Sequence, residues 1–148
     1  MITRLAPFTA ALVLTALPAL AQGPSALTAR DAWVREAPAS RPTSAAYLVL
    51  ENGSASDIVV VSASTPAAKV VELHEMRDED GKMRMRKVEK IVVPAKGSVT
   101  LKPGGLHVML FELTGALEAG KVVSFTFTLA DGKTLTVEAQ VRAGGGMH

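Results

Sequence analysis

The stretch V-E-L-H-E-M-R-D-E-D-G-K-M-R-M-R-K-V, residues 71–88, decides how this chain folds. It alternates apolar and polar side chains around Asp80-Gly81, a dipeptide that favours a type I′ turn between two strands. Residues two apart in a strand point to the same face, so His74 and Met76 share one surface. The stretch therefore predicts a β-hairpin that carries soft metal-binding side chains on one side.

The register of this hairpin decides whether its sulfur atoms gather. A two-residue loop places Met76 opposite Met85 and Asp78 opposite Met83, all on the face of His74, whereas a three-residue loop turns Met83 and Met85 away. The reverse face of the second strand carries three cations, whose burial would be costly. We therefore expect an arm that projects from the domain with both faces in water. The three cations are Lys82, Arg84 and Arg86.

A third pair of soft residues lies farther along the chain, at His107 and Met109. Apart from Met1 the chain has five methionines, and four of them lie between His74 and Met109, together with two of the three histidines. Core filling does not explain this concentration. In the strand expected at 106–113, His107 and Met109 face away from the apolar Val108, although Phe111 shares their face.

The ligand chemistry of these side chains favours monovalent copper. Thioether selects Cu(I) among biological metals, and imidazole accepts it. Zinc sites usually recruit cysteine or carboxylate beside histidine, and calcium or magnesium sites need oxygen. Glu72, on the face of His74, is a candidate to orient an imidazole instead of binding a metal itself.

Composition excludes several other functions. The chain has no cysteine, which excludes a disulfide framework, a lipidated cysteine, a thiol redox centre and a blue-copper thiolate site. Without residues 1–21 it has 15 basic and 14 acidic side chains, because Arg4 is the one charge there. A net charge so close to zero gives no reason to expect nucleic acid or an acidic membrane as a partner.

The N-terminus has the features of a cleavable export signal. Arg4 precedes a mostly apolar segment, and Ala19-Leu20-Ala21 forms a small-residue cleavage site. We expect a signal peptide over 1–21, a linker over 22–30, a copper-binding β domain over 31–142 and a flexible tail over 143–148. A retained N-terminal anchor is the less favoured alternative.

Short alternating segments separated by glycine, proline, asparagine and aspartate fill the rest of the chain, and no helical period extends beyond two turns. This spacing predicts an all-β domain, either a β-sandwich or a Greek-key barrel. The expected strands lie near 31–36, 45–52, 57–64, 69–77, 82–88, 90–93, 98–102, 106–113, 121–129 and 134–141.

The sequence resembles the periplasmic CuA copper chaperone family, PCuAC, whose signature is His-x10-Met-x21-His-x-Met. His74, Met85, His107 and Met109 match its four positions without a gap. The segment around Ala46-Tyr47 and the approach to His107 are also similar to the family. The resemblance extends over essentially the whole expected domain.

This resemblance implies a cupredoxin-like β-barrel that holds one Cu(I) at an exposed site formed by His74, Met85, His107 and Met109. It also implies delivery of copper in the periplasm for cytochrome c oxidase assembly, either to the subunit that carries the CuA centre or to an intermediary thiol chaperone. Met76 and Met83 lie outside the signature and are treated as auxiliary.

Three alternatives remain open beside the chaperone. A copper enzyme or electron carrier needs ligands that serve both oxidation states, which thioethers do not favour. No Ser/His/Asp set or pair of catalytic acids is evident, so we expect a carrier instead of an enzyme. A copper-buffering or resistance protein would use the same site, and a metal-free β-sandwich adaptor would use the methionines as a binding surface. The tail residues Met147 and His148 are more typical of a frayed terminus than of a second site.

Overall fold

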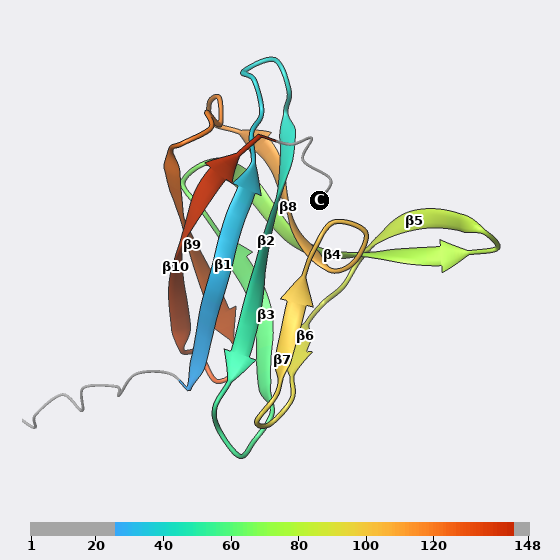
Figure 1. Cartoon of the computed structure of the whole chain (residues 1–148), viewed down its shortest axis with the longest axis vertical. Helices are drawn as coiled ribbons and strands as arrows, with labels where there is room; N and C mark the ends of the chain where they lie inside the picture. The colour runs from blue at the N-terminus through green and yellow to red at the C-terminus, as the bar shows by residue number, and fades with distance from the viewer. Residues whose placement is uncertain (1–25, 144–148) are drawn as a thin grey trace, which may run out of the picture.

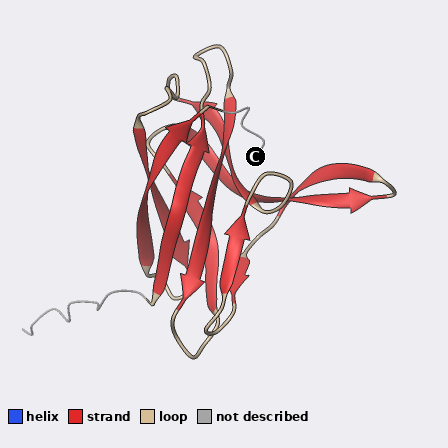
Figure 2. Ribbon diagram, in the orientation of Figure 1, coloured by secondary structure: helices blue, strands red, loops and turns tan. Residues whose placement is uncertain are grey.

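The computed structural model describes residues 26–143, and these residues form ten strands and no helix (Figure 2). No part of this range therefore provides a helix that could cross a lipid bilayer. The strands are β1 (Leu27–Arg35), β2 (Thr43–Asn52), β3 (Ile58–Ser64), β4 (Ala68–Glu79), β5 (Lys82–Lys87), β6 (Ile91–Val93), β7 (Ser98–Leu101), β8 (His107–Leu113), β9 (Val122–Leu129) and β10 (Thr134–Arg142).

Each expected strand is present, but the first begins earlier than predicted. Residues 27–30, expected in the linker, pair with residues 49–52 of β2, and Leu27 is buried in the core. The alternation is interrupted because the ladder shifts register between Arg30 and Trp33, with Asp31 at a φ of 54°. The expected signal peptide, the start of the linker and the tail from residue 144 lie outside the described residues.

One ten-stranded sheet forms the whole domain, in the order β5-β4-β8-β2-β1-β10-β9-β3-β6, with β7 paired to β2 (Figure 1). β1 and β10 are parallel, whereas the other pairs are antiparallel. β2 divides its ladder between two neighbours, because residues 43–46 pair with β8 and residues 48–51 pair with β7. Tyr47 lies at the division.

The sheet surrounds a single apolar core. Alternate residues of neighbouring strands point inward, and the largest fully buried side chains are Phe125 and Phe127 of β9. On β4 and β8 the inward residues are Leu73, Val108 and Leu110. Because side chains alternate, the residues between them point to the outer face of the sheet.

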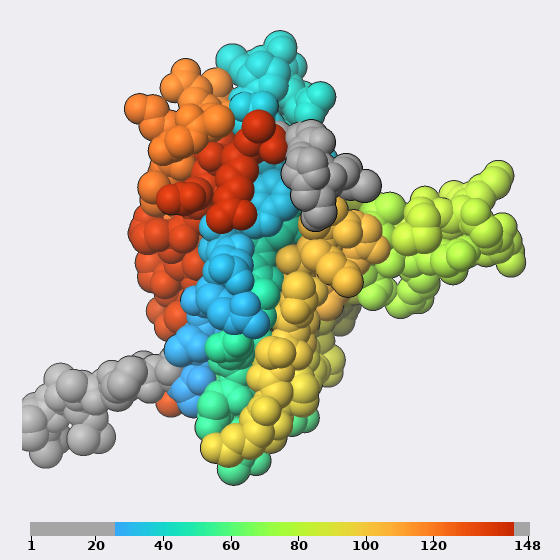
Figure 3. Space-filling model, viewed as in Figure 1, coloured from blue at the N-terminus to red at the C-terminus, as the bar shows by residue number. Residues whose placement is uncertain are grey.

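The end of β4 and the whole of β5 leave the body of the domain as a two-stranded arm, defined here as residues 75–87 (Figures 1 and 3). All six residues of β5 are exposed. On one face Glu79 pairs with Arg84 and Arg86, and Glu75 pairs with Arg77. The expectation of an arm with both faces in water is confirmed.

Candidate metal centre

Two histidines from different strands meet on the outer face of the sheet. In the ladder between β4 and β8, His74 lies directly opposite His107, and Glu72 lies opposite Met109. The two imidazole rings have their centroids 5.8 Å apart. Directly paired residues have their Cβ atoms about 4.5–5.5 Å apart, so their rings are expected to be neighbours. The face of His107, which the sequence left uncertain, is therefore the face of His74.

The arm brings a third member of the signature to the same place. Its turn has the two-residue type I′ form, with Asp80 at a φ of 56° and Gly81 at 79°. Met76 consequently lies opposite Met85, as the two-residue register predicts. The Sδ atom of Met85 is 3.3 Å from Nε2 of His107.

Met109 completes the group along a shallow cleft of about 370 Å³. Met76, Met85, His107 and Met109 line this cleft together with Tyr47. His74 is not among the lining residues and is only 7% exposed. The structure thus gathers all four sequence-predicted site residues, with the thioethers toward the cleft.

The expected exposed site needs one correction. His107 is 5% exposed, so both imidazoles are buried, whereas Met85 is 43% exposed. Neighbouring aromatic rings on the same face cover the histidines: the ring of Phe111 lies 5.8 Å from that of His74, and the ring of Tyr47 lies 6.4 Å from that of His107. Only the sulfur side of the group is open to solvent.

Each imidazole donates a hydrogen bond to an oxygen atom from one of its ring nitrogens. The other ring nitrogen then carries a lone pair and no proton. Nε2 of His74 lies 2.7 Å from Oε2 of Glu72, and Nδ1 of His107 lies 3.1 Å from the carbonyl oxygen of Gly105. Since these oxygens accept, the two nitrogens are assigned as the donors. Nδ1 of His74 is then left buried without a hydrogen-bond partner, and Nε2 of His107 presents its lone pair to the sulfur of Met85.

The surroundings of His107 disfavour the charged form of its imidazole. Burial lowers the pKa of His107 below its ordinary value of 6.5, the Gly105 carbonyl opposes this, and electrostatic interactions with His74 and Arg35 lower the pKa further. Hydrogen bonding by His74 lowers the pKa of the Glu72 carboxyl, with Lys87 acting in the same direction. A neutral imidazole is the form that binds a metal ion.

The spacing of one donor pair, His107 and Met85, suits a single soft ion. A metal lies about 2.0 Å from an imidazole nitrogen and about 2.3 Å from a sulfur ligand, so two donors to one ion are at most about 4.3 Å apart. The 3.3 Å between His107 Nε2 and Met85 Sδ satisfies this limit. Within residues 26–143 there is no group of three or more His, Cys, Asp or Glu side chains arranged to hold a metal.

Sequence reasoning missed the aromatic and cationic side of the site. The ring of Tyr47 lies 4.6 Å from that of Trp33, and its hydroxyl accepts a hydrogen bond of 3.2 Å from Nη2 of Arg35. Side chains alternate along β1 and β2, so Trp33, Arg35 and Tyr47 could have been assigned to the face of His107. That assignment needs the strand order, which the sequence does not supply.

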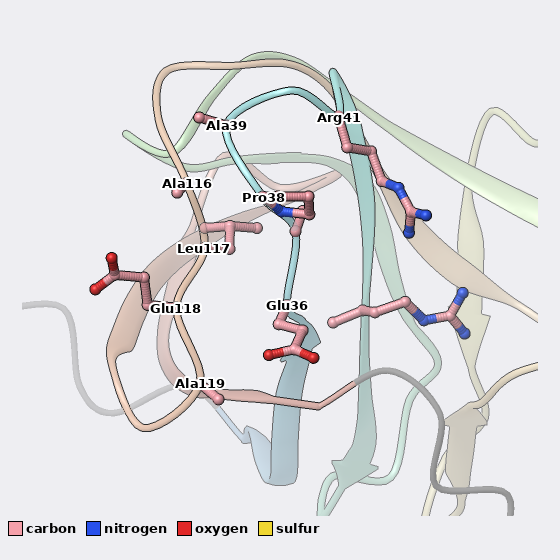
Figure 4. Close-up of a pocket in the computed structure, with 10 residues that line it drawn as sticks. Glu36, Pro38, Ala39, Arg41, Ala116, Leu117, Glu118 and Ala119 are labelled. Carbon is pink, nitrogen blue, oxygen red and sulfur yellow. The ribbon is translucent and has the colours of Figure 1, made fainter.

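A second cleft adjoins this region at the end of β1, and Figure 4 shows the residues that line it. Arg35 and Arg41 line both clefts, whereas Glu36 and Leu117 belong only to the second. This cleft contains no histidine or methionine, so it offers no soft donor.

Comparison with known proteins gives a family match over most of the chain. The family model described as "Putative lipoprotein LpqE-like" matches residues 27–141. "Putative lipoprotein Lxx21020" from Leifsonia xyli subsp. xyli is 34% identical over 131 residues, which is 85% of this chain and 78% of that relative. The sequence of this chain contains no cysteine.

Solved structures share the fold. The solution structure of CuI-DR1885 from Deinococcus radiodurans is 33% identical, with a TM-score of 0.65, and the match covers 91% of this chain and 85% of that chain. The copper-bound PCuAC domain from PmoF2 is 18% identical, with a TM-score of 0.69 over 81% of this chain and 95% of that domain. The expected all-β, cupredoxin-like Greek-key class is confirmed.

The family match and the curated relative cover the same body of the domain, from β1 to β10, that carries the His and Met face. The relative exceeds 30% identity over more than two thirds of its own length. The chain therefore belongs to the LpqE-like family.

Proposed function

We propose that this chain is a copper chaperone that binds one Cu(I) through His74, Met85, His107 and Met109. One observation carries the proposal: four soft or borderline donors, from three strands, meet on one face beside a cleft.

The chemistry of the donors supports a carrier of Cu(I) instead of a redox site or an enzyme. Two neutral imidazoles and two thioethers add no charge, and thioether sulfur disfavours Cu(II). Glu72 would act on the ion indirectly, by fixing the ring of His74 so that Nδ1 stays available. An ion held from the cleft side remains accessible to a partner through the exposed Met85.

The relatives support the same cargo, and the family resemblance of the sequence suggests the destination. CuI-DR1885 is named as a Cu(I) form, and two neighbours are named as PCuAC domains with and without copper. On this likeness and the His-x10-Met-x21-His-x-Met spacing, we propose that the chain acts in the periplasm after cleavage of residues 1–21. The acceptor would be the CuA-bearing subunit of cytochrome c oxidase or an intermediary thiol chaperone.

A competition titration with a colorimetric Cu(I) chelator tests binding. The wild-type chain should take up one tight equivalent, and His107→Ala and Met85→Leu should each weaken it strongly. Val122→Ala is the matched control, because Val122 is an exposed apolar residue of β9 that does not line the cleft. Absence of tight Cu(I) binding would favour the metal-free adaptor.

Transfer separates a chaperone from a buffer. The Cu(I)-loaded chain is mixed with an apo CuA domain, and the visible absorption of the assembled centre is followed after oxidation. A chaperone should load the acceptor faster than an equal amount of chelated Cu(I) does. A chain that binds copper and retains it would be a buffering or resistance protein. Reversible cycling to a coloured Cu(II) form at the same site would instead indicate an electron carrier.

A further inference from the structure

We propose that Met83 is a transfer ligand, an exposed thioether outside the resting site that joins Met85 in drawing Cu(I) from that site and presents the ion to the partner. This inference rests on the proposed function. It assigns a second soft-metal position, formed by Met83 and Met85, on the outer part of the arm.

The register places Met83 in line with the proposed site. Met76 lies opposite Met85 and Asp78 opposite Met83 in the ladder between β4 and β5. All four side chains therefore share the face of His74. From the cleft outward along β5, this face presents Met85 and then Met83. The charged pairs of the arm occupy the reverse face.

Solvent exposure distinguishes the thioethers of the arm from the imidazoles of the resting site. Met83 is 55% exposed and Met85 43%, whereas the two imidazoles are nearly covered. The other exposed large apolar side chains among residues 26–143 are all valines, at positions 61, 70, 92 and 122. Strongly exposed sulfur within this range therefore occurs only on the arm, where a methionine does not fill a core.

The distances along the arm allow a direct step. Residues two apart on one face of a strand are separated by about 6.6 Å. Methionine has three rotatable side-chain bonds, so two such side chains can bring their sulfur atoms to one ion. In the step, a bond between copper and the Met83 sulfur forms while the bond to Met85 is kept, and the bonds to His74, His107 and Met109 then break. Copper stays Cu(I) throughout, and no electron or proton is transferred.

The tip of the arm offers no competing ligand on this face. Asp78, the residue opposite Met83, has Oδ1 engaged 2.8 Å from the backbone nitrogen of Gly81. A carboxylate oxygen is in any case a poor donor for Cu(I). Cu(I) that reaches the outer arm is thus held by thioether alone, and a partner with imidazole or thiolate donors would remove it.

Stopped-flow copper exchange tests the proposal. Wild type and Met83→Leu are loaded with one equivalent of Cu(I), and transfer to a chelator and to an apo CuA domain is timed. Leucine keeps the apolar volume but removes the sulfur, so the equilibrium affinity should stay unchanged while transfer slows by about tenfold. Met83→His, which restores a donor, should recover most of the rate. Arg84→Gln, on the reverse face of the same strand, is the matched control.

Two results would overturn the inference. An unchanged transfer rate in Met83→Leu would mean that Met83 takes no part in transfer. A loss of affinity as large as the loss of rate would place Met83 among the resting ligands. Failure of the proposed function has a different signature, because the wild type would then bind no tight equivalent of Cu(I) and Met85→Leu would have no affinity to lose.

Discussion

Glu72 engages Nε2 of His74 and leaves Nδ1 of the same ring without a hydrogen-bond partner. Its carboxylate holds Nε2 at 2.7 Å, and Lys87 lies 3.3 Å from the other carboxylate oxygen. A partner that fixes an imidazole in this way typically contributes a factor of about 10 to 100 in metal affinity. The residue is thus important for the proposed site although it does not bind the ion.

Replacing this carboxylate gives the first prediction at the residue scale. Glu72→Gln should lower Cu(I) affinity by about 10- to 100-fold, because the amide can also turn its NH2 group toward the ring and no longer fixes its tautomer. Glu75→Gln is the matched control, since Glu75 lies on the reverse face of β4 and pairs with Arg77. Chelator competition measures both, and equal losses would contradict an orienting role for Glu72.

The second prediction concerns the protonation of His107. Burial lowers the pKa of His107, so the folded chain binds this proton more weakly than the unfolded chain does. The associated stability is present above pH 6.5 and is lost as the pH falls through the folded pKa. An NMR titration of the His107 ring in the metal-free protein should therefore give a midpoint below 6.5. Arg35→Gln should raise that midpoint, and a wild-type midpoint above 6.5 would refute the assignment.

The hairpin of β4 and β5 is the element that assembles the site, because its loop length sets the face of Met85. One residue inserted between Asp80 and Gly81 should turn Met83 and Met85 to the reverse face and abolish tight Cu(I) binding. Two inserted residues should restore the parity and recover much of the affinity. Binding by both insertion variants equal to that of the wild type would show that Met85 is dispensable.

The elements were largely predictable, for a local reason. Alternation and turn residues are properties of short segments, and Asp80-Gly81 specifies its own turn. The start of β1 was missed because the irregularity at Asp31 breaks the alternation. The burial of the imidazoles was missed because it depends on packing between strands: Tyr47 of β2 lies beside His107 of β8, and Phe111 of β8 lies beside His74 of β4.

At the scale of the whole molecule, the order of the strands in the sheet could not be predicted from the sequence. The parallel pairing of β1 with β10 and the divided ladder of β2 join segments far apart in the chain, and periodicity carries no information about such partners. The convergence of His74 with His107 was nevertheless anticipated, because the family spacing implied it. The contribution of Arg35 was not, because nothing in its local sequence marks it.

The hydrophobic core and the proposed ligands lie on opposite faces of the sheet, and this arrangement gives a prediction about stability. Phe127 is 1% exposed and lies on the inner face, so Phe127→Ala should lower the free energy of unfolding by about 3–5 kcal/mol, measured by urea denaturation. Cu(I) affinity of the folded variant should remain near that of wild type, because the proposed ligands lie on the outer face. Val122→Ala, at an exposed position, should change stability by less than about 0.5 kcal/mol. A parallel loss of affinity in Phe127→Ala would show that core and site are coupled.

The division of the donors between body and arm has a consequence for release. His74, His107 and Met109 lie on strands fixed in the large sheet, whereas Met85 lies on β5, whose one neighbour is β4. Fraying of that terminal strand would withdraw one thioether while the rest of the domain stays folded. The apparent Cu(I) affinity is then proportional to the fraction of molecules in which β5 remains paired with β4. A recipient that captures the frayed form would unload the cargo without ever touching the covered imidazoles.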